Sequence, residues 1–235
     1  MAFRFKQFIV EDDRSTMRIG TDAILLGTWT EPGEAQSILE IGTGCGVISL
    51  MLAQKSGARI DAIDIDEESI KQAEYNFRQS PWSEKLHPLR VSLQEHMKSS
   101  PQQYDLVITN PPFFIDSMKS PDARRNRARH TTDLNQMDLI TGITRMLKKE
   151  GCFQVILPSG ESRRFSDLAQ ASGLFIQEQM KVSPKAGKPV NRILSRFGFQ
   201  PCPEPSLQEL AIRNNDNSFT KEYIRFTLPY YFSLR

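Results

Sequence analysis

The stretch ITNPPFF, residues 108–114, places an asparagine and two prolines at the end of an apolar run. Proline fixes φ near about −65° and has no backbone N–H, and Pro112 also restricts Pro111 to an extended conformation. The side-chain oxygen of Asn110 and the carbonyl oxygen of Pro111 can therefore lie together at a rigid, acceptor-rich corner. Two convergent acceptors suit a planar amino group, and Phe113 is placed to stack on the flat face of a base.

A glycine-rich loop, EIGTGCG at residues 40–46, lies between an apolar run and a helical pattern. Gly42, Gly44 and Gly46 alternate, which is more glycine than a strand-to-helix turn requires and lets a ligand approach the backbone closely. The dinucleotide fingerprint G-x-G-x-x-G has its third glycine one residue later than this loop does, and the G-K-[ST] sequence that a P-loop needs is absent here. The loop therefore favours a nucleoside ligand without a dedicated phosphate site.

The next apolar run ends in acids, in the stretch DAIDIDEE at residues 61–68. Asp64 lies 18 positions after Gly46, close to where an α/β nucleotide fold places the acid that binds ribose hydroxyls. Asp66 is the natural cap of the following helix, which leaves Asp64 for the ribose. A nucleoside site of this kind indicates S-adenosylmethionine as the cofactor.

The loop and the corner together predict methyl transfer to an amino nitrogen. The lone pair of an aromatic amine is delocalised into its ring, so this nitrogen is a poor nucleophile. Hydrogen bonds accepted from both of its N–H groups favour a pyramidal nitrogen, and they strengthen as positive charge develops in the transition state. The candidate catalytic residues are therefore Asn110, Pro111, Pro112 and Phe113.

These residues need strands and helices to position them, and short apolar runs alternate with helical patterns as far as residue 173. Expected strands cover residues 37–42, 59–65, 86–92, 104–110 and 152–158, and expected helices cover 47–55, 67–79, 134–149 and 160–173. Asp133 is the expected cap of the third helix, and Gly151 follows its end. The alternation implies crossover connections and a mostly parallel sheet.

The pattern changes after residue 173. Four strand-like segments with short polar connections follow, at residues 175–183, 191–199, 208–214 and 222–228. We expect a single domain over residues 1–235. It would comprise an N-terminal extension (1–30), a cofactor-binding core (31–173) and an antiparallel C-terminal part (174–235).

Composition indicates an ordinary soluble protein, with 39% hydrophobic and 25% charged residues. No apolar run reaches the roughly 18 residues that span a bilayer, and the N-terminus lacks the apolar region of a signal peptide. We therefore expect a cytoplasmic protein without membrane contact. Cys45, Cys152 and Cys202 form no C-x-x-C pair, which argues against a disulfide framework and a zinc site. No metal is expected.

The net charge is only +2, so the whole molecule gives no sign of nucleic-acid binding. Local clusters of basic residues do indicate it. The run KSPDARRNRARH, residues 119–130, holds five Lys/Arg against one Asp and follows the NPPFF corner directly. Such clusters bind RNA phosphates, although an isolated run of this kind is also typical of a solvated surface loop. A second basic group comprises Lys181, Lys185, Lys188, Arg192 and Arg196.

At these motifs the chain resembles the class I S-adenosylmethionine-dependent methyltransferases, and among them the amino-group methylases with an N/D-P-P-Y/F motif. Three segments extend the match: residues 3–29, NPPFF followed by RARH, and residues 210–232, of which RIGTDAILLG (18–27) and RARH (127–130) are the more specific. They are similar to the bacterial family that methylates adenosine 37 of a valine tRNA at N6. The resemblance implies a Rossmann-like fold with a mostly parallel seven-stranded sheet and an antiparallel C-terminal edge.

The resemblance also implies roles for individual residues. Thr21 and Asp22 would lie near the methionine end of the cofactor, and Ser92 stands where many relatives carry an acid that binds the cofactor adenine. The implied cofactor-binding set is Thr21, Asp22, Glu40, Gly42, Gly44, Asp64, Ser92 and Asn110. The implied contacts to the tRNA anticodon loop are Arg124, Arg125, Arg127 and Arg129, with Lys188 and Arg192 as further candidates.

Other functions remain compatible with the motifs. NPPF alone also fits protein glutamine N5-methyltransferases, whose amide presents the same NH2 group, and rRNA guanine N2-methyltransferases. A non-catalytic RNA-binding relative is a third possibility, which the intact corner and glycine loop disfavour.

Overall fold

The computed structural model describes residues 2–111 and 135–232. Four predictions fall outside this range: the catalytic roles of Pro112 and Phe113, the cap at Asp133, and the basic run at residues 119–130.

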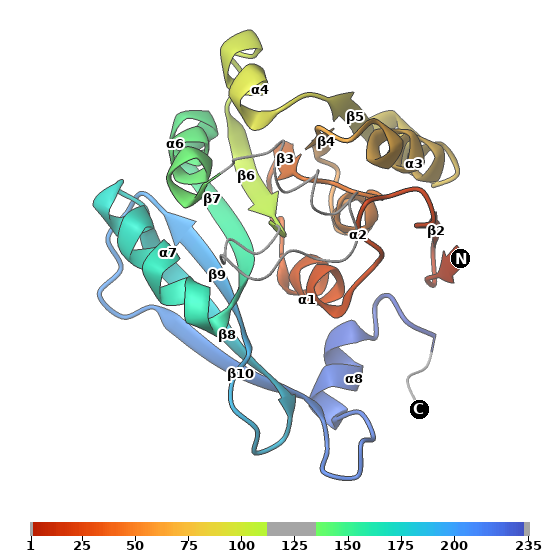
Figure 1. Ribbon diagram of the computed structural model, residues 1–235, viewed down its shortest axis with the longest axis vertical. Helices are drawn as coiled ribbons and strands as arrows, with labels where there is room; N and C mark the ends of the chain where they lie inside the picture. The colour runs from red at the N-terminus through yellow and green to blue at the C-terminus, as the bar shows by residue number, and fades with distance from the viewer. Residues whose placement is uncertain (1, 112–134, 233–235) are drawn as a thin grey trace.

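A large sheet forms the centre of the molecule (Figure 1), with the strand order β10-β8-β9-β7-β6-β3-β4-β5. All neighbouring strands are parallel except β9, which runs against both β7 and β8. In the described residues the sheet is mostly parallel, as predicted, but it has eight strands where seven were expected. The additional strand β10 pairs in parallel with β8, so the C-terminal part is antiparallel only through β9. The strands are β3 (Ser37–Ile41), β4 (Arg59–Asp64), β5 (Leu86–Arg90), β6 (Tyr104–Thr109), β7 (Leu147–Pro158), β8 (Phe175–Lys185), β9 (Arg192–Gly198) and β10 (Ser206–Arg213).

Helices cover both faces of the sheet and enclose two separate cores. One core lies under α1 (Thr21–Trp29), α2 (Val47–Lys55) and α3 (Glu67–Arg78). The other lies under α4 (Leu93–Ser99), α6 (Gln136–Met146) and α7 (Ser159–Ala171). The alternating side chains of β3 divide between them, since Ile38 belongs to the first core and Leu39 to the second. The short helix η1 (Ser83–Lys85) precedes β5.

Among the described residues, two α-helices have no counterpart in the predicted elements. Helix α1 buries every residue from Ala23 to Trp29, so its sequence carries no alternation of polar and apolar faces. Helix α4 is short and begins at a capping box that Ser92 forms with Glu95.

Several predicted boundaries are wrong. Residues 222–228, expected as a strand, lie mostly in the helix α8 (Lys221–Thr227), because the Thr220 side chain accepts the Tyr223 N–H and caps a helix. Helix α6 ends at Met146 and is capped by Asn135, whose side chain accepts the Asp138 N–H. Gly151 lies inside β7.

The N-terminal part begins with a two-stranded antiparallel hairpin, β1 (Ala2–Arg4) and β2 (Ile9–Glu11). The C-terminal segment joins it, since the Lys6 N–H donates to the Tyr230 carbonyl at 2.9 Å and Phe5 stacks on Tyr231. The two ends of the chain therefore support each other.

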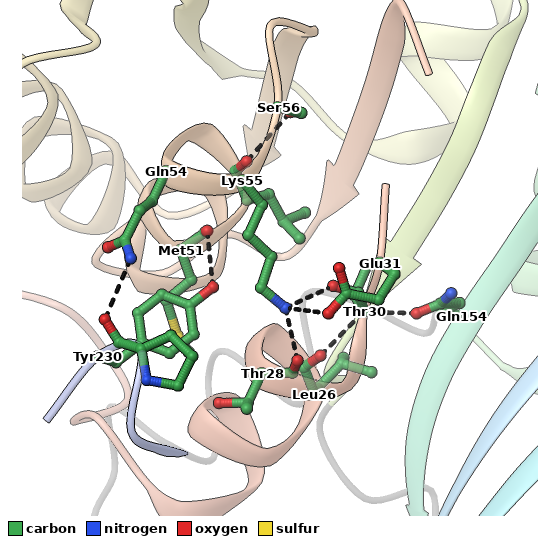
Figure 2. Close-up of polar contacts among 12 residues, drawn as sticks. Leu26, Thr28, Thr30, Glu31, Met51, Gln54, Lys55, Ser56, Gln154 and Tyr230 are labelled. Carbon is green, nitrogen blue, oxygen red and sulfur yellow. Dashed lines mark hydrogen bonds and ion pairs between the residues drawn. The ribbon is translucent and has the colours of Figure 1, made fainter. Parts of the chain in front are cut away.

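Figure 2 shows how Lys55 joins α2 to the end of α1 and how the C-terminal segment is bonded to α2. The Lys55 ammonium donates to the Thr28 and Thr30 carbonyls and pairs with Glu31, so it satisfies the end of α1. The Tyr230 hydroxyl donates to the Met51 carbonyl at 2.9 Å. These contacts fix α1, whose first turn carries Thr21 and Asp22, against the helix that follows the glycine loop.

The three cysteines are free, as predicted. Within residues 2–111 and 135–232, no helix is long and apolar enough to cross a membrane.

Candidate functional site

Strand register brings three of the predicted site residues together at the carboxyl edge of the sheet. Ile41 of β3 lies opposite Ile63 of β4 on one side and Thr109 of β6 on the other. The next residues along these strands are Gly42, Asp64 and Asn110, so Gly42 leaves the sheet between the acid and the amide. This edge is where open α/β sheets bind their ligands.

The three glycines of the loop have different environments. A Cβ atom at Gly42 would meet nothing within 4 Å, so the backbone there is open to a ligand. At Gly44 a Cβ would lie 3.3 Å from the Ser15 hydroxyl, and at Gly46 only 2.4 Å from the Phe77 ring. All three have a positive φ, a conformation that favours glycine. Gly42 therefore opens the site, whereas Gly46 serves the packing of α3.

Asp64 and Asp66 have different roles, and the predicted role of Asp66 as a helix cap is confirmed. The Asp66 side chain accepts the Ser69 N–H at 2.8 Å and caps α3, which confirms its structural role. The Asp64 carboxylate accepts the backbone N–H groups of Gly44 and Asp66, one on each oxygen. Burial raises the pKa of Asp64, and these two hydrogen bonds oppose that rise. Each oxygen retains a lone pair, so the carboxylate fits two hydroxyl donors.

Glu40 accepts hydrogen bonds from the glycine loop and from the helix that follows it. It is fully buried, and one carboxylate oxygen accepts the Thr43 hydroxyl at 2.8 Å together with the Ser49 hydroxyl and backbone N–H. Burial raises its pKa to about 7, against the opposing hydrogen bonds from Ser49 and Thr43. Glu40 thus joins the loop to the first turn of α2, and its contact with the cofactor stays a prediction.

The first turn of α1 is linked to the C-terminal part of the sheet. The Arg192 side chain of β9 donates to the Asp22 carboxylate at 2.8 Å, and both side chains are largely buried. Arg192 was predicted to contact RNA and Asp22 to lie near the cofactor, and sequence spacing gave no signal that they pair. Thr21, the first residue of α1, is exposed beside this pair.

Ser92 lies in a capping box. Its hydroxyl accepts the Glu95 N–H at 3.1 Å and donates to the Glu95 carboxylate at 2.7 Å. Its backbone follows Val91, whose N–H donates to the Asp64 carbonyl. Ser92 therefore lies near the end of β4, and its role toward the cofactor adenine is still a prediction.

Asn110 is half-buried and Pro111 is buried at the end of β6. The Thr109 hydroxyl donates to the Ile41 carbonyl at 2.8 Å, which fixes the end of β6 to the end of β3. The corner therefore starts from a rigid support next to the glycine loop.

The second basic group divides into two places. Arg192 lies opposite Pro158 at the carboxyl edge, and exposed Lys188 is in the adjoining β8–β9 turn. Arg196 lies opposite Gln154 in the middle of β7 and lines a cavity of about 310 Å³ with Glu178. Lys181 lies opposite Ile193, one residue from Arg192, and Lys185 ends β8, so Arg196 is the member of this group that lies away from the edge that carries Asn110.

The donor set fits S-adenosylmethionine. Gly42 offers open space, and Asp64 offers a carboxylate for ribose hydroxyls. Among the described residues, no group of three or more His, Cys, Asp or Glu could hold a metal ion.

The sheet order and this site define a class I methyltransferase. The model of the methyltransferase small domain family matches residues 15–159, and the chain belongs to this family. S-adenosyl-L-methionine is therefore its expected cofactor.

Two bacterial proteins named tRNA1(Val) (adenine(37)-N6)-methyltransferase are similar to nearly the whole chain. The protein from Parabacteroides distasonis is 37% identical over 232 residues, which cover 99% of this chain and 98% of the relative. The protein from Tolumonas auensis is 38% identical over 232 residues, which cover 98% and 96%. Among solved structures, a predicted O-methyltransferase from Agrobacterium tumefaciens matches with a TM-score of 0.67 at 15% identity. That match covers 89% of this chain and 96% of the other, and it shows the fold alone.

Proposed function

We propose that the chain transfers a methyl group from S-adenosylmethionine to the exocyclic N6 amino group of an adenine in tRNA, namely adenosine 37 of tRNA(Val). The observation that carries the proposal is the position of Asn110 beside Gly42 at the carboxyl edge of the sheet. The two near-full-length relatives named for this reaction support the choice of RNA substrate.

In this proposal the cofactor supplies an electrophilic methyl group on its sulfonium. Asp64 holds the ribose hydroxyls, and Gly42 allows the cofactor to lie against the loop backbone. The Asn110 side-chain oxygen and the Pro111 carbonyl oxygen accept the two N6 N–H groups of the target adenine. These acceptors bind the amino group more strongly as positive charge develops on it, which lowers the barrier to transfer. Phe113, carried over from the sequence prediction, stacks on the base.

The tRNA contacts proposed are of two kinds. Arg124, Arg125, Arg127 and Arg129 belong to the segment outside the described residues, and their role rests on sequence. Lys188 is exposed in the turn between β8 and β9. The backbone N–H of Ser159, the residue that follows β7, donates to the Asn191 carbonyl of the same turn. This turn therefore lies at the edge that carries Asn110, where a phosphate of the anticodon loop can reach it.

The proposal is tested by incubating the purified chain with methyl-labelled S-adenosylmethionine and either total tRNA or total protein of the source cells. Label in tRNA, recovered as N6-methyladenosine, is the expected result. Label in protein, recovered as N5-methylglutamine, would instead identify a protein methyltransferase. Label in guanine would indicate N2 transfer, and no transfer to any substrate would indicate a non-catalytic RNA-binding protein.

A further inference from the structure

Helix α3 carries a row of buried polar side chains where a helix normally buries apolar ones. Ser69, Gln72 and Asn76 are at most 2% exposed, and their spacing of three and four residues places them on one face. Buried polar groups are retained when they have specific partners. All three contact a single segment, residues 11–19, which we call the N-terminal strap.

The contacts run in order along the strap. Asn76 accepts the Glu11 N–H at 3.0 Å and donates to the Glu11 carbonyl at 2.8 Å. Gln72 accepts the Arg14 N–H at 3.2 Å, and Ser69 accepts the Thr16 N–H at 3.3 Å. Side chains of α3 therefore form the hydrogen bonds with the strap backbone that a neighbouring strand would form in a sheet.

The same row also holds the glycine loop. The Asn76 amide donates to the Cys45 carbonyl at 2.8 Å, so one side chain joins the strap and the loop. The strap passes so close to the loop that a Cβ at Gly44 would lie 3.3 Å from the Ser15 hydroxyl. The strap ends at Ile19, and Gly20 then precedes Thr21 and Asp22 at the start of α1.

We propose that Ser69, Gln72 and Asn76 are positioning residues for the cofactor, because they hold the strap against the glycine loop as one wall of the cofactor site. Ser15 is the strap side chain that lies against Gly44 of the glycine loop. Loosening the strap weakens cofactor binding while the methyl-transfer corner at Asn110 stays intact. This inference rests on the proposed function, since it takes the glycine loop as the S-adenosylmethionine site.

The test compares Gln72→Met and Ser69→Ala with the wild type. Each removes one acceptor of a strap N–H with little change of shape, so each should fold. We expect faster hydrogen exchange of the Arg14 amide in the first variant and of the Thr16 amide in the second. The Kd for S-adenosylhomocysteine, measured by calorimetry without RNA, should rise about tenfold, and kcat at saturating cofactor should stay within about twofold.

Thr227→Val is the matched control, because it removes a buried hydroxyl that donates to the Tyr223 carbonyl far from the loop. It should lower Tm and leave the cofactor Kd unchanged. An unchanged Kd in both strap variants, unchanged amide exchange, or an equal rise of Kd in the control would overturn the inference. Because this Kd needs no tRNA, failure of the RNA proposal is visible separately as cofactor binding without transfer to tRNA.

Discussion

The backbone N–H of Gly44 donates a 2.9 Å hydrogen bond to the Asp64 carboxylate. This bond joins the glycine loop to the end of β4, and the second oxygen of Asp64 accepts the Asp66 N–H at the start of the next helix. The acid is thus held by backbone groups on both sides and presents a fixed geometry to a ligand.

Asp64→Ala should therefore weaken cofactor binding strongly. It removes the acceptor for ribose hydroxyls and releases the Gly44 N–H, and hydrogen bonds to a charged group contribute about 1.5–3 kcal/mol each. We expect the Kd for S-adenosylhomocysteine to rise at least tenfold by calorimetry. Asp66→Ser, which removes a nearby charge but keeps a helix cap, should change it little. A Kd unaltered by Asp64→Ala would remove Asp64 from the site.

Substitutions of Gly42 and Gly46 should have different effects, because Gly42 leaves space for a ligand whereas Gly46 contributes to packing. Gly46→Ala places a Cβ 2.4 Å from the Phe77 ring at a positive φ, so it should cost about 3 kcal/mol or more. Gly42→Ala meets no neighbour and should cost about 1–2 kcal/mol while abolishing cofactor binding. Urea unfolding and calorimetry measure the two effects. Tight cofactor binding by Gly42→Ala would show that the cofactor does not approach this backbone.

Glu40 should make the folded state less stable as pH rises. Burial raises its folded pKa to about 7 from an ordinary 4.5, so its contribution is full below pH 4.5 and is lost as pH rises through 7. One pKa unit corresponds to about 1.4 kcal/mol, and the loss is therefore of the order of 3 kcal/mol.

Glu40→Gln keeps an oxygen for Thr43 and Ser49 but does not titrate. Its free energy of unfolding, measured by urea titration across this pH range, should fall less than that of the wild type. Parallel pH profiles for the two proteins would contradict the assignment of this slope to Glu40.

Lys188 and Arg192 should behave differently although both are basic and close in sequence. Lys188→Gln should lower tRNA affinity and reduce the slope of log K against log salt by about 1, with no change in Tm. Arg192→Gln should lower Tm, because it leaves the largely buried Asp22 carboxylate without its ion-pair partner. Filter binding at several salt concentrations and thermal melts distinguish the two. A Tm unaffected by Arg192→Gln would indicate that the ion pair is not structural.

The central strands and the site edge could be predicted from sequence because their signals are local. Buried parallel strands read as apolar runs, and the glycine loop, Asp64 and Asn110 each follow such a run. Parallel order then places them at one edge, as the register of β3, β4 and β6 confirms. Asp66 was correctly identified as a helix cap because capping depends on the next few residues only.

The remaining features depend on contacts between distant segments. The pairing of Asp22 with Arg192 and the strap on α3 join residues that no local pattern relates. Helix α1 lacks a polar face because it is buried on all sides, and α8 was misread as a strand because a short helix with large apolar residues resembles one. Ser69, Gln72 and Asn76 recur at helical spacing beside the apolar face of α3, but polar residues at such spacing are ordinarily exposed, so the local pattern did not indicate their burial.

The most direct test of the central claim is mass spectrometry of nucleosides and fragments from tRNA(Val) after reaction with the purified chain and S-adenosylmethionine. We expect N6-methyladenosine at position 37, formed about 10²–10³-fold more slowly by Asn110→Ala, which binds tRNA with nearly the same affinity. Absence of N6-methyladenosine from tRNA treated with the wild-type protein, or turnover by Asn110→Ala equal to that of the wild type, would contradict it.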